Sequence, residues 1–295
     1  MRHTDPRWLD RNGEPIDEDH RGLVYDVQTL IDRRRALGIF GGVALTSLLA
    51  ACSAQSTDAA TTGGATSSPT ASATPTASPS TSADASGPLA EVPDETGGPY
   101  PGDGSNGVDV LDDSGIVRSD IRSSFGSSTT VAQGVPLTIA LTVRDASTGS
   151  ALAGRGVYVW HCDRDGKYSL YGSGVENENY LRGVQQTDAN GTVRFTSIYP
   201  ACYSGRWPHI HFEVYQDVAT AVASGPIVKT SQIALPAEAD SAVYATTGYE
   251  QSVPNLAQVS LQTDNVFRDD GGIHQIATMS GSATGGYIAS LTIGL

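Results

Sequence analysis

The stretch Tyr203-Ser-Gly-Arg-Trp-Pro-His-Ile-His-Phe-Glu-Val-Tyr215 indicates which kind of fold this chain adopts. From His209 onward, apolar residues alternate with polar or aromatic ones, which is the period of a β-strand with two different faces. The imidazoles of His209 and His211 therefore project from the same face. Imidazole is a common metal ligand, and two on one strand face are suited to binding a single ion. We predict a strand here with a candidate metal-binding pair.

The chain around this strand is rich in short β-type segments. Three further runs have strand character: Leu137–Val143, Val157–Trp160 and Thr192–Ser197. The sequence Asp188-Ala-Asn-Gly191 is typical of a hairpin turn between pairing strands. No convincing helical period occurs between Glu91 and Leu295. We predict an all-β protein with an antiparallel β-sandwich, in which residues 216–295 complete the same domain.

The first 52 residues have the features of an export signal. Arg34-Arg35-Ala36-Leu37 precedes a short apolar run and resembles a twin-arginine motif. The run has about 16 residues, fewer than the roughly 20 that span a membrane. It ends in Leu49-Ala50-Ala51-Cys52, which resembles a lipobox with Cys52 as the lipidated residue. We expect an exported, cell-surface lipoprotein anchored through Cys52; an ordinary secretory signal with a chance cysteine is the alternative.

Residues 53–90 join this signal to the predicted domain. Most of the segment consists of Ser, Thr, Ala, Pro and Gly, and no residue from 53 to 86 is aromatic. Such a segment cannot bury enough apolar surface to offset its loss of conformational entropy. We therefore predict a disordered tether over 53–90 and a single folded domain over 91–295.

Charge and cysteine content restrict the possible partners and bonds. The chain has 18 Lys+Arg against 32 Asp+Glu, a formal net charge of −14, which disfavours a nucleic-acid partner. If Cys52 is lipidated, Cys162 and Cys202 remain. In an oxidising compartment an even pair favours a disulfide, and two reduced, buried thiols are the alternative.

A set of motifs in a fixed order resembles the intradiol ring-cleavage dioxygenases, the family of catechol and protocatechuate dioxygenases. The motifs, all within residues 95–290, are Gly98-Pro-Tyr100, Gly166-Lys-Tyr168, Leu181-Arg-Gly183, Pro200-Ala-Cys-Tyr203 and Arg206-Trp-Pro-His209-Ile-His211. His-x-His alone is a weak signal, whereas the ordered set is specific. The resemblance implies the β-sandwich of that family as the catalytic domain.

The resemblance also implies a mononuclear, non-haem Fe(III) cofactor. Its protein ligands would be two phenolates and two neutral imidazoles, from Tyr168, Tyr203, His209 and His211. Anionic oxygen ligands suit a hard ferric ion, and only a metal or a comparable positive charge would hold two phenolates near neutral pH.

Nearby residues compete for some of these roles. Tyr171 or Tyr180 could replace Tyr168, and Tyr199 could replace Tyr203. Other candidates have ordinary structural explanations. His161 and Trp160 are typical of a buried core, Trp207 of a pocket wall, and His274 of a loop.

Two further residues are expected beside the substrate. Arg206 would stabilise negative charge that develops on the ring, with a salt bridge to Glu213 or another carboxylate as its structural alternative. Gln232 would assist Arg206, although it follows His211 at a longer interval than is usual in the family. Tyr203 would be displaced by the substrate and take up one of its protons.

The predicted function is ring cleavage of a catechol between its two hydroxyl-bearing carbons. The substrates would be a catechol, in aromatic-compound catabolism, and O2, and the product a cis,cis-muconate. We expect a possible homodimer, no nucleic-acid partner, and membrane contact only through Cys52. The alternatives are a catalytically silent exported binding module and a copper or zinc protein with a site at His209 and His211.

Overall fold

The computed structural model describes residues 87–295. The predicted export signal and lipidation site, and the tether up to residue 86, lie outside the described residues. Within the described part of the chain, no helix has the length and hydrophobicity needed to cross a membrane. Leu89, which lies in the predicted tether, already contacts the sandwich: its backbone N–H donates to the carbonyl of Ala146 at 2.7 Å.

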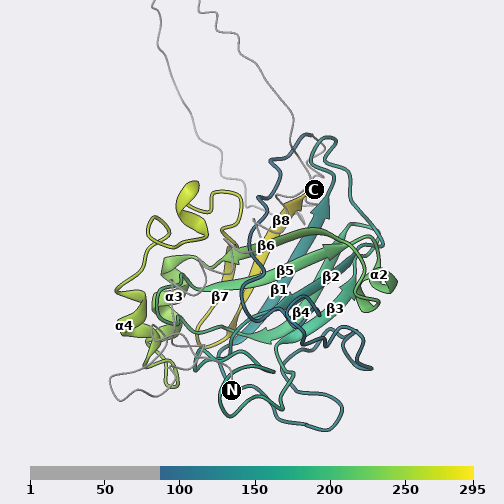
Figure 1. Ribbon diagram of the computed structural model, residues 1–295. Coiled ribbons are helices and arrows are strands. Elements are labelled where there is room, and N and C mark those ends of the chain that lie inside the picture. The colour runs from purple at the N-terminus through teal and green to yellow at the C-terminus, as the bar shows by residue number, and fades with distance from the viewer. Residues whose placement is uncertain (1–86) are drawn as a thin grey trace, which may run out of the picture.

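The domain consists of two four-stranded sheets (Figure 1). One sheet has the order β4-β1-β8-β7, with the bounds Thr192–Ile198, Pro136–Arg144, Gly286–Gly294 and Thr278–Ser282. The other has the order β3-β2-β5-β6, with the bounds Arg182–Gln186, Gly156–Trp160, His209–Tyr215 and Ile227–Ala234. Neighbouring strands are antiparallel, apart from β1 and β8. The predicted all-β sandwich and its four predicted strands are confirmed.

The helices are short and lie outside the two sheets. They are α2 (Val218–Val222), α3 (Ala237–Tyr244), α4 (Ser252–Leu256) and the 3-10 turn η3 (Phe267–Asp269). In Figure 1, α3 and α4 lie at the left of the sandwich and α2 lies at the right. Their shortness explains why the sequence shows no helical period.

The prediction that Asp188–Gly191 joins two pairing strands is wrong. The turn does form, since the Gly191 N–H donates to the Asp188 carbonyl at 2.9 Å. However, β3 before the turn pairs with β2, and β4 after it pairs with β1. The carbonyl of Gly191 accepts from the N–H of Val143 at 2.7 Å, which draws the outgoing chain toward β1. The turn therefore carries the chain from one sheet to the other.

Strand β5 lies at the centre of the fold, and all seven of its residues are buried. Ile210, Phe212 and Val214 pack into the core between the two sheets, as their alternation predicts. Tyr215 belongs to a second cluster, on the opposite face of the β3-β2-β5-β6 sheet, with Tyr100, Val110, Leu111, Ile116, Tyr158 and Trp160. The chain between residues 100 and 116 thus covers the face from which the two histidines project.

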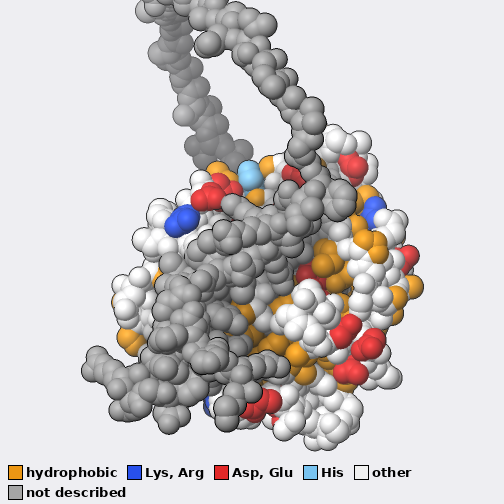
Figure 2. All heavy atoms as spheres, in the orientation of Figure 1, with side chains coloured by type: hydrophobic (Ala, Val, Ile, Leu, Met, Phe, Trp, Pro, Cys, Tyr) orange, Lys and Arg blue, Asp and Glu red, His pale blue; other side chains and the backbone are white. Residues whose placement is uncertain are grey.

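Acidic side chains are more numerous than basic ones on the face in Figure 2, in keeping with the net charge of −14. A surface of this kind repels polyanions such as nucleic acid.

Candidate metal centre

Four side-chain donor atoms converge on one point above β5. The Nε2 atoms of His209 and His211 are 3.1 Å apart. The hydroxyl of Tyr168 lies 3.3 Å from the first and 3.2 Å from the second. The hydroxyl of Tyr203 lies 3.2 Å from Nε2 of His209. The structure therefore brings together all four residues that the sequence indicates as metal ligands.

The two tyrosines come from loops that local hydrogen bonds shape. Tyr168 follows a turn in which Oδ1 of Asp163 accepts from the N–H groups of Asp165 and Lys167, both at 2.9 Å. Within this turn Gly166 has a φ of 84°, and a Cβ there would lie 3.2 Å from the Cβ of Tyr203. A glycine at this position thus allows the two tyrosine loops to pack closely.

Contacts with neighbouring groups set the orientation of both imidazole rings. Nδ1 of His209 lies 2.5 Å from the Trp207 carbonyl, so it carries the proton and Nε2 presents a lone pair to the centre. The ring of His211 stacks on Trp160, with centroids 4.8 Å apart and planes 9° apart. A Cβ on Gly98 would lie 3.3 Å from Cε1 of His211, so the backbone at Gly98 also rests against this ring.

The protonation states of the donors suit a metal ion. Burial, and then the nearby charge of Arg206, hold the pKa of His209 well below the ordinary histidine value. Burial, followed by the neighbouring His209, does the same for His211. Both imidazoles are therefore neutral and able to donate a lone pair. Burial raises the pKa of Tyr168 well above its ordinary value, so that this phenol ionises only if a cation offsets the charge.

The arrangement of donors fits a single metal ion. Separations of 3.1–3.3 Å are those of atoms that share an ion at about 2.0–2.1 Å, the distance typical of metal–nitrogen and metal–oxygen bonds. Among residues 87–295, no cluster of three or more His, Cys, Asp and Glu side chains could hold a metal. A metal bound at the histidine pair would therefore need phenol oxygens to complete its ligands.

Arg206 lies next to the donors in a fixed position. Its Nη1 is 3.4 Å from Nε2 of His209, and its Nη2 donates to Oε1 of Gln232 at 2.6 Å. Gln232 lies opposite His211 on β6, and its own Nε2 donates to the Thr96 carbonyl at 2.9 Å. The predicted pair of Arg206 and Gln232 is thus assembled, despite the long interval between His211 and Gln232 in the sequence.

The sequence reasoning missed Asp264, the buried carboxylate that holds Arg206. Nε of Arg206 donates to Oδ2 of Asp264 at 2.9 Å, and the two side chains are 2 % and 0 % exposed. Oδ2 also accepts from the backbone of Trp207 at 2.7 Å, and Oδ1 accepts from Val266 at 2.8 Å. Glu213, the partner considered from the sequence, accepts from the hydroxyl of Tyr215. Asp264 stands in a polar run, Gln-Thr-Asp-Asn, that resembles an exposed loop.

Comparisons with known proteins identify the fold of this chain. A family model described as Dioxygenase (Dioxygenase_C) matches residues 125–226, which include the four donors and Arg206. An intradiol ring-cleavage dioxygenase from Tetranychus urticae superposes with a TM-score of 0.56 at 24% identity, covering 70% of this chain and 94% of that one. The chain has the intradiol dioxygenase fold. The resemblance that the sequence indicates is confirmed.

A second dioxygenase crystal structure shares the intradiol fold with a TM-score of 0.56 at 23% identity, covering 70% of this chain and 94% of that one. Among curated proteins, no relative matches the chain.

The competing tyrosines and histidines have other partners within the intradiol fold. The Tyr180 hydroxyl donates to Asp163 at 3.0 Å and that of Tyr199 to Asp240 at 2.7 Å, while Tyr171 bonds to Asn106 at 3.0 Å. Nε2 of His161 lies 2.7 Å from the hydroxyl of Ser197, inside the core. His274 lies in an exposed turn, as predicted.

The predicted disulfide between Cys162 and Cys202 is absent. Both residues are free, buried thiols, which was the alternative left open. Sγ of Cys162 donates to the Ala201 carbonyl at 3.6 Å, and Sγ of Cys202 to that of Arg206 at 3.5 Å. Each thiol is thus directed at a backbone carbonyl.

Proposed function

We propose that this protein is a non-haem Fe(III) dioxygenase that cleaves catechols between the two hydroxyl-bearing carbons, with O2 as the second substrate. The observation that carries the proposal is the convergence of two phenol oxygens and two imidazole nitrogens beside a fixed guanidinium. Tyr168, Tyr203, His209 and His211 would hold the ion. When bound, a ferric ion would withdraw electron density from a catecholate and make the ring reactive toward O2.

Tyr203 is the residue best placed to handle a substrate proton. It is half-buried, whereas the other three donor residues are at most 2 % exposed. A catechol arriving from solvent therefore meets Tyr203 first. In its phenolate form, Tyr203 would accept a proton from one catechol hydroxyl and become a phenol, a general-base role that prepares the substrate for binding as an anion.

Arg206 supplies a fixed positive charge beside the reacting ring. Because Asp264 and Gln232 hold its guanidinium, the group needs little rearrangement when negative charge develops on the substrate. A preorganised charge of this kind lowers the barrier to reaction. The overall reaction joins one catechol and one O2 into one cis,cis-muconate, so it balances without a reductant.

We also propose that the enzyme acts outside the cytoplasm, attached to a membrane through Cys52. The support is the sequence alone: the twin-arginine-like motif, the lipobox-like motif and the Ser- and Thr-rich segment that follows. Such a location favours environmental aromatic compounds as substrates.

The direct test is to load the purified protein with iron and measure O2 uptake with a panel of catechols. We expect a visible tyrosinate-to-iron absorption band and uptake of one O2 for each catechol consumed. Bound iron without uptake for any catechol would instead favour the silent binding module. A protein that stays colourless after iron loading would contradict the ferric site.

A further inference from the structure

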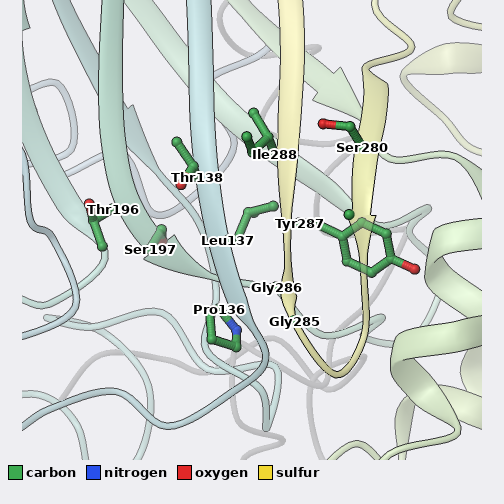
Figure 3. A pocket seen from close by; sticks show the side chains of 11 residues that line it. Pro136, Leu137, Thr138, Thr196, Ser197, Ser280, Gly285, Gly286, Tyr287 and Ile288 are labelled. Carbon is green, nitrogen blue, oxygen red and sulfur yellow. The ribbon is translucent and has the colours of Figure 1, made fainter.

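A cavity of about 600 Å³ lies beside Tyr203. Its walls come from the turn before Tyr168, the loop after β4 and the start of α4. Its charged and polar lining residues include Arg164, Asp165, Lys167, Ser204 and Gln251. The volume lies within the range of about 300–1,000 Å³ that is usual for small-molecule sites. By contrast, a cavity of about 270 Å³ across β1, β4, β7 and β8 has no charged lining residue (Figure 3).

The residues that line the cavity beside Tyr203 carry two positive charges and one negative charge. Among the described residues, no carboxylate forms an ion pair with Arg164 or Lys167, although Glu250, next to the lining residue Gln251, is close enough for its charge to interact with that of Arg164. Nζ of Lys167 donates to the Ser173 carbonyl at 2.6 Å, which leaves other ammonium donors available. Asp165 is the one acidic residue that lines the cavity. In a chain with 18 Lys+Arg against 32 Asp+Glu, this lining favours an anionic ligand.

Tyr203 connects the cavity to the donor atoms. Its side chain lines the cavity, and its hydroxyl reaches 3.2 Å from Nε2 of His209. Among the four donor residues, Tyr203 alone lines the cavity, so the cavity adjoins the donor atoms at this residue. The volume is larger than a carboxyl group attached directly to the ring would fill, so the cavity suits a longer side chain.

We propose that this cavity is a substrate subsite, in which Arg164 and Lys167 bind the carboxylate of a catechol with an extended acidic side chain, of the 3-(3,4-dihydroxyphenyl)propionate kind. The inference rests on the function proposed above and specifies its substrate class. A carboxylate can accept charge-assisted hydrogen bonds from both the guanidinium and the ammonium group. Ser204 and Gln251 offer neutral hydrogen-bonding groups in the same lining.

The test compares 3-(3,4-dihydroxyphenyl)propionate with its methyl ester, which has nearly the same shape but no charge. We expect the wild-type protein to prefer the acid in kcat/KM, and the double variant R164Q/K167Q to lower this preference by about tenfold. Arg194, exposed on β4 in the other sheet, provides the matched control R194Q, which should keep the preference. An unchanged preference in the double variant would overturn the proposal.

A second readout does not depend on turnover. Calorimetric titration of the iron-free protein should show tighter binding of the acid than of the ester, and the difference should be lost in R164Q/K167Q but not in R194Q. If no catechol is cleaved while this difference remains, the proposed function fails and the anion site stands. Equal binding of acid and ester by the wild-type protein would refute the subsite, even if catechols are cleaved.

Discussion

Replacing Asp264 with asparagine should destabilise the protein strongly, because Asp264 is the buried counter-charge of Arg206. The two side chains are 0 % and 2 % exposed, and their closest atoms are 2.9 Å apart. The variant keeps the shape of the side chain but leaves a buried guanidinium without a carboxylate. Breaking a buried ion pair on one side costs about 3–5 kcal/mol. That is a large part of the roughly 5–15 kcal/mol that stabilises a typical domain.

The assay is urea titration of the protein and its variants, which measures the free energy of unfolding of each. Asp269 provides the matched control: it is 92 % exposed and its nearest cation, on Arg268, is 3.9 Å away. D269N should change the free energy by no more than about 0.5 kcal/mol. In a double-mutant cycle, D264N with R206Q should cost less than the two single changes together. If D264N unfolds like the wild type, or if the cycle shows no coupling, the reasoning about this pair is refuted.

Three other perturbations test separate parts of the structure. Tyr203→Phe should leave the far-UV circular dichroism unchanged but remove much of the visible absorption of the iron-loaded protein; an unchanged spectrum would show that Tyr203 is not a ligand. Burial, together with the charges of Asp270 and Asp269, raises the pKa of Glu95 to about 7 from its ordinary value of 4.5. The folded state therefore binds more protons than the unfolded state between these values, and the free energy of unfolding should fall as pH rises from about 4.5 to about 7. Glu95→Gln should flatten this dependence, and a slope equal to that of the wild type would contradict the assignment. Burial raises the pKa of both Cys162 and Cys202, so a thiol reagent should react with them slowly in the folded protein and fully after unfolding without a reductant. Failure to detect either thiol after unfolding would indicate a disulfide.

Local patterns in the sequence predict the parts of the fold that depend on neighbouring residues. The alternation from His209 to Tyr215 specifies both faces of β5, because the side chains of a strand alternate strictly. Through their resemblance to the intradiol dioxygenases, the Gly-x-Tyr and Pro-x-x-Tyr motifs indicate Tyr168 and Tyr203, which the structure places within 3.3 Å of the histidine nitrogens.

Features that depend on contacts between distant segments of the chain could not be predicted from local sequence patterns. Asp188–Gly191 has the composition of a hairpin turn, but strand pairing with β1 decides where the next strand goes. Asp264 lies 58 residues from Arg206 in a polar run, so no local pattern connects the two. The two cysteines that remain when Cys52 is set aside favoured a disulfide, whereas the fold directs each of their thiols at a carbonyl.

The measurement that tests the central claim most directly is mass spectrometry of the product formed from catechol and 18O-labelled O2 by the iron-loaded protein. Ring cleavage between the two hydroxyl-bearing carbons predicts a cis,cis-muconate in which the added oxygen atoms come from O2. A preparation that binds iron through the four donors but returns unchanged catechol would contradict the claim. So would a product opened beside, rather than between, the hydroxyl-bearing carbons.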